Sequence, residues 1–340
     1  MEPGEGSRDA DAKSLPSMLG TPSRFWNKLG AEHTADLELH GFEQAKRHLA
    51  LRYFSWRWSW AAITRSRQMR FLLANTSPLT WLRCAMASAD LSDQTWKGVE
   101  WPRRDRWLYT FAVRLLWEYA SSHGNRDVLD LEEPQLGSPL PVHWRGRLVS
   151  QDLGNCALEA VAIKRAFVGR PAPRSILEVG AGYGRTAYSM LKLFPECTYT
   201  IVDIEPAIRL SKWYLSSLFP SERLRFLSPE QAFDLPASSI DLAVSISSLQ
   251  EMTTDQVKGY LDLIDKVADG GVVYLKQWEK WTNPDDGIEM QFDQYPVPGR
   301  WIQRFRQSAA VQSNFQEAVW LIPGQPTREK ENREDPTLGR

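Results

Sequence analysis

The segment Glu178-Val-Gly-Ala-Gly-Tyr-Gly184 contains the residues best suited to bind a ligand. It follows a short apolar stretch, SILEV, and precedes a stretch with helical periodicity from Arg185 to Phe194. Glycines let the backbone turn sharply and approach a ligand closely, and the first turn of a helix offers free N–H groups. We therefore predict a ligand-binding loop at the carboxyl end of a strand, where open α/β sheets bind their ligands.

The spacing of the glycines distinguishes two kinds of nucleotide site. A dinucleotide fingerprint that starts at Gly180 needs glycine at position 185, where this chain has Arg185. The pattern here is E-x-G-x-G-x-G, which resembles the first motif of the class I S-adenosylmethionine-dependent methyltransferases. In that family the loop surrounds the methionine part of the cofactor. The resemblance implies that S-adenosylmethionine is the cofactor and that it is contacted by Glu178, Gly180, Ala181, Gly182, Tyr183 and Gly184.

Further cofactor contacts are expected after the next strands. Asp203 ends the stretch TYTIVD, about 20 residues past the loop, where a carboxylate can accept hydrogen bonds from the hydroxyls of a ribose. Ile204 would then lie against the adenine. After the stretch RLRFL the family usually places a polar contact to the adenine amino group, for which Glu230 and Gln231 are both candidates. Ser245 is a further cofactor-binding candidate, one strand later.

The turn Ser247-Ser-Leu-Gln-Glu-Met252 carries the candidates for catalysis. It follows the stretch IDLAVSI and should lie at the same sheet edge as the glycine loop. Many small-molecule methyltransferases have a histidine base here, but no histidine follows His143 in this chain. We predict that Glu251 replaces it as the general base that activates an alcohol, with Gln250 or Ser248 holding the substrate. The alternative is that Glu251 caps the helix that follows.

Two longer runs, DLAVSISSLQEM and LDLEEPQLGSPLPVHWRGRLVSQDL, resemble a bacterial family of sugar O-methyltransferases, with similarity from about Asp127 to Ile322. That family usually has Asn where this chain has Ser245. The resemblance implies methyl transfer to a hydroxyl of a sugar or a glycosylated small molecule. Aromatic faces pack against amphipathic ligands. The predicted substrate contacts are Trp278 and Trp281 by stacking, Asp285 by accepting hydroxyls, and Arg147 and Gln151 from the connector. No metal site is predicted.

The elements that must position these residues indicate a Rossmann-like fold of the α/β class. The stretches SILEV, TYTIVD, RLRFL, IDLAVSI and GVVYLKQ are short and apolar, and helical segments separate the earlier ones, which indicates a mostly parallel sheet. Residues 290–296 and 317–322 could add antiparallel edge strands. We expect helices within 35–88, at 104–121 and at 156–168. The predicted organisation is an unstructured tail 1–24, a helical region with a Pro/Gly-rich connector 25–165, a methyltransferase domain 166–323 and a tail 324–340.

A second function class is suggested by the segment from Gln44 to Ala89, which has no acidic residue and many arginines interleaved with aromatic side chains. Such a segment suits single-stranded nucleic acid, so an RNA or DNA methyltransferase is one alternative. The turn SLQEM lacks the Asn/Asp-Pro-Pro-aromatic sequence of base N-methylating enzymes, so nucleic acid is not the favoured partner. The plain interpretation is that the aromatic residues pack and the arginines face solvent. A non-catalytic subunit that binds S-adenosylmethionine is the remaining alternative.

The overall composition excludes few further classes of protein. The 340 residues include 41 Lys plus Arg and 42 Asp plus Glu, so net charge favours neither a polyanion nor a membrane surface. Three cysteines without CxxC spacing and the lack of a long apolar stretch predict a cytoplasmic protein. Ten of the 15 tryptophans precede residue 150, which makes the helical region the expected location of substrate selection or of a homo-oligomer contact.

Overall fold

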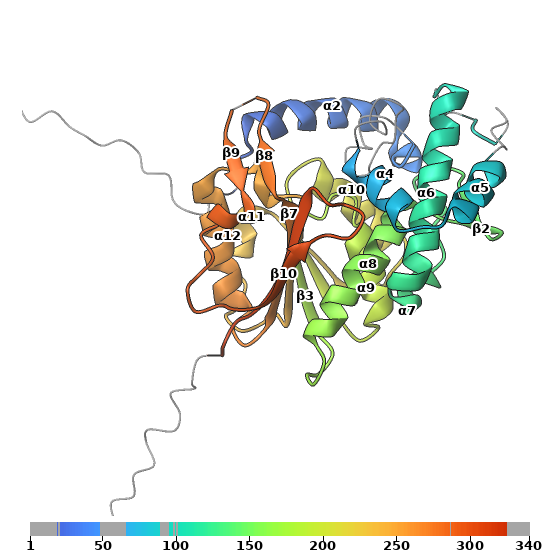
Figure 1. Ribbon diagram of the computed structural model, residues 1–340. Coiled ribbons are helices and arrows are strands. Elements are labelled where there is room, and N and C mark those ends of the chain that lie inside the picture. Colours follow the sequence, from blue (N-terminus) through green and yellow to red (C-terminus); the bar gives the residue numbers. More distant parts are fainter. Residues whose placement is uncertain are drawn as a thin grey trace, which may run out of the picture.

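A computed structural model describes residues 19, 21–47, 66–88, 95–97, 99, 101–285 and 287–324. A seven-stranded sheet forms its centre (Figure 1), in the order β10-β11-β7-β6-β3-β4-β5. The five strands β3 to β7 are parallel, and β11 runs antiparallel to β7 and β10. The predicted mostly parallel, Rossmann-like sheet is therefore confirmed. The strands are β3 (Ser175–Val179), β4 (Thr198–Val202), β5 (Leu224–Leu227), β6 (Leu242–Ile246), β7 (Val272–Trp278), β10 (Ile302–Ser308) and β11 (Phe315–Leu321).

Helices cover both faces of the sheet, because successive strand residues point to opposite sides. Ile176 of β3 belongs to the core cluster that contains buried residues of α8, α9 and α10, whereas the next residue, Leu177, belongs to the cluster that contains residues of α11 and α12. Both side chains are fully buried, as expected for a strand covered on two faces. The helices around the sheet are α8 (Gln151–Ala166), α9 (Arg185–Leu193), α10 (Ala207–Ser216), α11 (Pro229–Ala232) and α12 (Thr254–Val267), with the one-turn helices η3 (Ser221–Arg223) and η4 (Leu249–Glu251).

The part before the sheet is mainly helical. The helix expected at 104–121 is present as α6, which is buried on most of its sides and packs on α8 and on the helices α4 and α5. The remaining elements are α2 (Arg24–His40), η1 (Phe42–Gln44), α4 (Arg67–Ala74), α5 (Pro78–Ala87), α6 (Arg103–His123), α7 (Arg126–Leu129), β1 (His143–Trp144) and β2 (Arg147–Leu148). Within the described ranges no helix is both long enough and apolar enough to cross a bilayer.

Two expected edge strands are corrected by the structure. Residues 317–322 belong largely to β11, which is buried and has hydrogen-bonded neighbours on both sides, so the edge strand is the polar, exposed β10. Residues 290–296 do not join the main sheet. Their first part belongs to β9 (Glu289–Gln291), which pairs with β8 (Lys280–Thr282) in a separate hairpin followed by η5 (Phe292–Gln294).

The predicted ends of two segments also differ from those in the structure. The helix predicted from residue 156 begins at Gln151, because the Ser150 side chain accepts a hydrogen bond from the Leu153 N–H and caps it. The predicted tail of 1–24 extends too far. Leu19 is buried in the core beside α12, and Ser23 caps α2, so the chain is packed before residue 24. Residues 1–18 and 325–340 of the predicted tails lie outside the described residues.

A buried ion network joins α8 and α9 to the sheet. The Glu159 carboxylate accepts two hydrogen bonds from the Arg185 guanidinium, at 2.9 and 3.1 Å, and one from Lys276 Nζ at 2.8 Å. Burial alone would raise the pKa of Glu159, but Arg185 and Lys276 outweigh it and lower that pKa to about 2. Arg185 is the residue that breaks the dinucleotide spacing. It therefore has a structural partner that a glycine could not bind.

Replacing Glu159 with Gln should destabilise the protein by about 3 kcal/mol, because two buried cations then lose their counter-charge. A depressed carboxyl pKa stabilises the fold above the ordinary value near 4.5, and this contribution is lost as the pH falls toward 2. The wild type should therefore lose this stability below pH 4.5, and the variant should not. Urea unfolding at pH 7 and at lower pH measures both effects.

Asp262→Asn is the matched control, because it removes an exposed ion pair with Lys258 that should contribute at most about 0.5 kcal/mol. If the Glu159→Gln variant unfolds at the same urea concentration as this control, the network does not stabilise the fold.

Candidate active site

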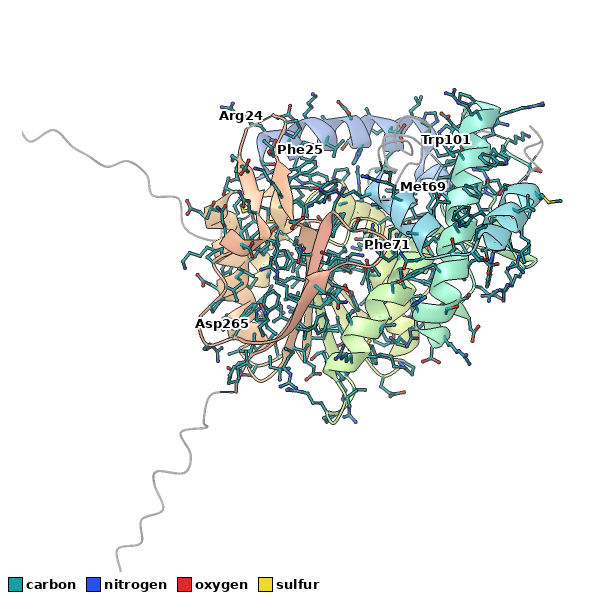
Figure 2. All side chains as sticks on the ribbon, viewed as in Figure 1. Arg24, Phe25, Met69, Phe71, Trp101 and Asp265 are labelled. Atoms are coloured by element: carbon teal, nitrogen blue, oxygen red, sulfur yellow. The ribbon has the colours of Figure 1, made fainter. Side chains whose placement is uncertain are left out.

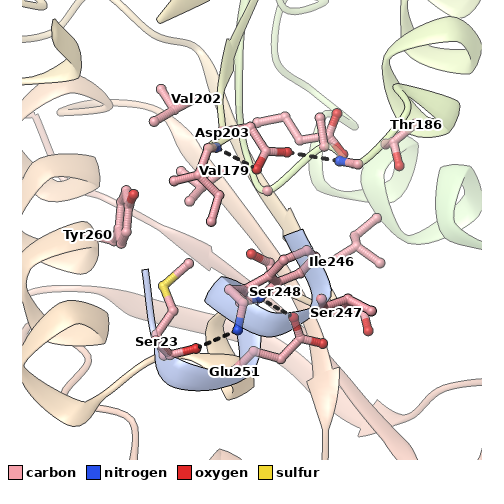
Figure 3. A pocket seen from close by; sticks show the side chains of 18 of the residues that line it. Ser23, Val179, Thr186, Val202, Asp203, Ile246, Ser247, Ser248, Glu251 and Tyr260 are labelled. Carbon is pink, nitrogen blue, oxygen red and sulfur yellow. Dashed lines mark hydrogen bonds between the residues drawn. The ribbon is translucent and has the colours of Figure 1, made fainter. Parts of the chain in front are cut away.

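A cavity of about 590 Å³ lies at the carboxyl edge of the parallel strands, within the usual size range of ligand sites (Figure 3). The glycine loop, the ends of β4 and β6, and the residues just before and within α2 form its walls. Most of the predicted site residues meet there. Those that line the cavity are Glu178, Gly180, Ala181, Gly182, Tyr183, Asp203, Ile204, Ser248, Glu251, Trp278 and Trp281.

The glycine loop packs directly against the turn after β6. Gly180 has a φ of +78°, and a Cβ built there would lie 2.0 Å from Ser248 Oγ. Only glycine avoids both the left-handed strain and this overlap. The Ser248 N–H is held by Gln277, whose side-chain oxygen accepts it at 2.9 Å. The predicted ligand loop and the predicted catalytic turn are therefore neighbours.

The Asp203 carboxylate is hydrogen-bonded to the glycine loop. Its Oδ2 accepts the Gly182 N–H at 3.0 Å, and its Oδ1 accepts the Ile204 N–H at 2.8 Å. Burial raises the pKa of Asp203 to about 7 in spite of these backbone donors. A ligand that brings hydroxyl donors would stabilise this carboxylate further. The adenosine ribose of S-adenosylmethionine fits that requirement.

Glu178 begins the loop and is almost fully buried. The Tyr199 hydroxyl donates to its Oε2 at 2.9 Å, and burial raises the pKa of Glu178 to about 7. In the same region, the Tyr183 hydroxyl donates to Asp152 Oδ2 at 2.6 Å. Asp152 and Asn155 of α8 line the cavity, and the buried Asn155 Oδ1 has no hydrogen-bond partner. Neither residue is among the predicted site residues. The Ser150 cap, which starts α8 early enough to place them there, was the available signal.

Glu251 lies in η4 on the cavity wall and is 2% exposed. Its Oε2 accepts a hydrogen bond from the indole Nε1 of Trp26 at 2.8 Å. The helix that follows is capped by Thr253, which forms a capping box with Gln256. The alternative interpretation of Glu251 as a helix cap is therefore wrong. Figure 3 shows Glu251 and Asp203 on opposite sides of the cavity.

Gln250 and Ser245 do not line the cavity but support the turn that contains Glu251. Gln250 Nε2 donates to Ser247 Oγ at 3.1 Å, and Ser247 has a φ of +56°, an uncommon value that the turn imposes. Ser245 Oγ is fully buried and accepts Gln277 Nε2 at 3.1 Å. In the described arrangement both residues orient the backbone and do not face a ligand.

Glu230 and Gln231, predicted for the adenine contact, do not line the cavity. The Gln231 side chain folds back to accept the Ser228 N–H at 2.9 Å in a capping box, and Glu230 is exposed on the same short helix. Gly184 also stays outside the cavity lining, where it forms the N-terminal cap of α9 with a φ of +95°.

The predicted substrate contacts outside the cavity have other partners. Arg147 Nη2 donates to the Leu131 carbonyl at 2.8 Å and lines a separate cavity of about 410 Å³. Gln151 is buried in the first turn of α8. Asp285 forms an ion pair with Lys28 of α2 at 3.7 Å. These three residues do not line the cavity, and their role as substrate contacts stays a prediction.

Aromatic side chains line the part of the cavity next to Glu251. The Trp278 ring lies 5.5 Å from Trp281 and 5.1 Å from Phe315, measured between ring centroids. The Trp281 Nε1 is buried without a hydrogen-bond partner. Leu19 and residues from the range 21–32 complete this wall, and they lie outside the predicted site because the predicted helices begin at residue 35. The apolar spacing of Phe25, Trp26 and Leu29 was the available signal. The lining residues from this segment are Leu19, Thr21, Pro22, Ser23, Trp26, Leu29 and Glu32.

The basic, aromatic segment 44–89 is described only in part, since residues 48–65 and 89 lie outside the described ranges. Lys46, one of its basic residues, is buried, and its Nζ donates to Glu133 at 2.8 Å and to the Tyr214 hydroxyl at 3.0 Å. Lys46 is therefore a structural cation that joins the N-terminal part to α10. Among the described residues, no three His, Cys, Asp or Glu side chains form a metal-binding group.

Comparison with known proteins finds methyltransferases. The chain is 30% identical over 112 residues to O-methyltransferase 3 of Dictyostelium discoideum, a match that covers 31% of this chain and 25% of that protein. It is 32% identical over 107 residues to release factor glutamine methyltransferase of Rhodopirellula baltica, covering 28% of this chain and 36% of that protein. The chain thus spans about a quarter to a third of the length of the curated relatives that it matches. No protein-family model matches the chain.

Among solved structures, the 1,6-didemethyltoxoflavin-N1-methyltransferase of Burkholderia thailandensis, with bound S-adenosylhomocysteine, aligns at 20% identity and a TM-score of 0.36. That alignment covers 48% of this chain and 77% of the other. The sheet order defines the fold: the parallel strands β3 to β7 are followed by the antiparallel β11 and the edge strand β10, in a Rossmann-like arrangement.

Gly180→Ala should destabilise the protein more than Gly169→Ala. Both glycines have a φ of +78°, but a Cβ at Gly169 meets nothing within 4 Å, whereas one at Gly180 overlaps Ser248. The Gly169 variant should cost about 1–2 kcal/mol from backbone strain, and the Gly180 variant a further ~1–3 kcal/mol from the overlap. Chemical denaturation of the two variants provides the comparison. Equal losses would mean that the loop does not pack on the Ser248 turn.

Proposed function

We propose that this protein is an S-adenosylmethionine-dependent methyltransferase. The observation that carries the proposal is the pairing of the glycine loop with Asp203, in the same cavity as Glu251. The Gly182 N–H orients the Asp203 carboxylate, and the Gly180 backbone lies at the cavity wall. These are the groups that would hold the ribose and the methionine part of the cofactor. The matches to two curated methyltransferases support the same assignment.

The finer part of the proposal is O-methyl transfer to a hydroxyl of a sugar or a glycosylated small molecule. When bound, S-adenosylmethionine supplies an electrophilic methyl group. Glu251 would accept the proton of the acceptor hydroxyl at a carboxylate oxygen, which makes the oxygen a better nucleophile. The buried position of Glu251 limits competition from water for that proton. The turn built on Ser248 and Gln277 keeps the carboxylate close to the cofactor loop.

The aromatic wall supports an acceptor with an apolar face. Trp278 and Trp281 lie with their ring planes 53° apart, so that together they form a bent surface beside Glu251. Sugar rings present C–H groups on one face and hydroxyls around the edge, and aromatic rings pack well against such amphipathic surfaces. A sugar packed on these rings could direct a hydroxyl at the Glu251 carboxylate.

Binding of S-adenosylhomocysteine should strengthen as the pH rises from 6 to 8. The Asp203 carboxyl is half-protonated near pH 7 without ligand, and ribose hydroxyls that donate to its ionised form would lower its pKa. Binding therefore favours the ionised form, and affinity should rise up to about tenfold per pH unit below 7 and level off above it. Calorimetry measures this profile.

Asp203→Asn should weaken binding and flatten the profile. Asp234→Asn, which changes an exposed acid outside the cavity lining, should retain the wild-type profile. If the intact protein does not bind S-adenosylhomocysteine at any of these pH values, the cofactor assignment is wrong.

Glu251→Gln should keep the affinity for S-adenosylhomocysteine and lose turnover by about 100-fold or more, because positioned bases contribute roughly 10²–10⁴ to such rates. Mass spectrometry of a glycoside panel incubated with S-adenosylmethionine measures the methylated products. Asp255→Asn, an exposed acid in the first turn of α12, is the control and should retain turnover. Unchanged turnover in Glu251→Gln would exclude this residue as the base. Methylation of non-glycoside acceptors alone would exclude the sugar assignment.

A further inference from the structure

Helix α2 lies across the cavity at the carboxyl edge of the sheet. Figure 1 shows it extending from the β8–β9 hairpin toward α4, above the strand ends. Just before the helix begins, the Thr21 carbonyl accepts a hydrogen bond from Gln256 Nε2 of α12 at 2.8 Å. Further along, a Cβ at Gly30 would lie 3.6 Å from the Glu205 carbonyl, in the loop that follows Asp203. The helix therefore bridges the two sides of the proposed site.

The first turn of α2 contacts the acceptor side. Phe25, beside the hairpin in Figure 2, meets the Trp281 ring edge-on at a centroid distance of 6.3 Å, and Lys28 pairs with Asp285 at 3.7 Å. Only Gly30, His33 and Leu37 of the helix are buried. Because so few residues of α2 are buried, the position of this helix depends mainly on its contacts with the cavity wall.

Trp26 of α2 contacts Glu251, the candidate base. Its indole Nε1 donates to Glu251 Oε2 at 2.8 Å, and Gln250 Nε2 lies 3.4 Å from the other carboxylate oxygen, Oε1. An indole N–H is a donor only, so Trp26 can neither remove a proton nor pass one on. It can fix the direction of the carboxylate and stabilise its ionised form.

We propose that Trp26 is the positioning residue for Glu251, so that the candidate base is aligned only when α2 is docked over the cavity. The inference rests on the proposed function, in which Glu251 removes the acceptor proton. The hydrogen bond to Oε2 holds the plane of the carboxylate in one orientation on the cavity wall. Sequence positions 26 and 251 are 225 residues apart, so only docking of α2 brings the two groups together.

Among the described residues, the titratable side chains of Tyr295 and His33 border this pair. Tyr295 is buried, and burial together with the Glu251 charge raises the pKa of its hydroxyl. The His33 ring meets the Trp26 ring edge-on, at a centroid distance of 6.4 Å. Both are retained in the variants below, so a change in the pH profile of these variants reports on the hydrogen bond from Trp26.

The first test needs no acceptor. In the full-length protein labelled with ¹⁵N-tryptophan and saturated with S-adenosylhomocysteine, Trp26→Phe identifies the Trp26 indole resonance as the one that disappears. Glu251→Gln should shift that resonance, and Asp255→Asn should leave it in place. A Trp26 resonance that does not respond to Glu251→Gln would overturn the inference. Because this variant retains Trp26, the test stands even if Trp26→Phe loosens α2.

The second test uses any glycoside that the panel shows to be methylated. Trp26→Phe keeps an aromatic ring but loses the N–H, so the acid limb of the kcat/KM profile should move to higher pH while the KM for S-adenosylmethionine stays unchanged. Trp81→Phe is the matched control, because its indole donates to Thr76 at 2.9 Å, among residues that do not line the cavity. An unshifted limb in Trp26→Phe overturns the positioning role. Full turnover in Glu251→Gln would instead overturn the base itself, which distinguishes the two failures.

Discussion

The close contact between Gly180 and Ser248 is the constraint on which the site depends. Two strands that lie side by side in the sheet, β3 and β6, each end in a turn, and these turns touch only because position 180 has no side chain. The contact sets the width of the cavity between the loop that would hold the cofactor and the turn that carries Glu251. A parallel sheet brings strand ends to one edge, but side-chain size decides whether the loops there can share one site.

A second constraint lies beneath the loop. Arg185 occupies the position where a dinucleotide site would need glycine, and its guanidinium binds Glu159 in a buried network with Lys276. Burying these charges is costly unless each is paired, so the network specifies how α8 and α9 meet the sheet. The first turn of α8 then brings Asp152 next to Tyr183 of the loop. The departure from one nucleotide fingerprint thus has a physical role in building a different site.

The N-terminal part contributes to the site as well as to packing. Lys46 is buried between Glu133 and Tyr214, and α2 covers the cavity from the hairpin to the loop after Asp203. The predicted domain boundary at residue 165 leaves some of the residues that line the cavity outside the predicted methyltransferase domain. Trp26 and Leu29 line the same cavity as the glycine loop.

Local patterns in the sequence determined the strands, the glycine loop and Asp203, because short apolar runs, left-handed glycines and strand ends depend on near neighbours. The sequence also indicated Glu251, since its turn follows the fourth parallel strand. The partner of Glu251 was decided only by the tertiary structure, because Trp26 is 225 residues away and its helix is amphipathic without specifying what it covers. The same holds for Gln231 and Arg147, whose side chains bind nearby backbone groups in the folded chain and do not reach the cavity.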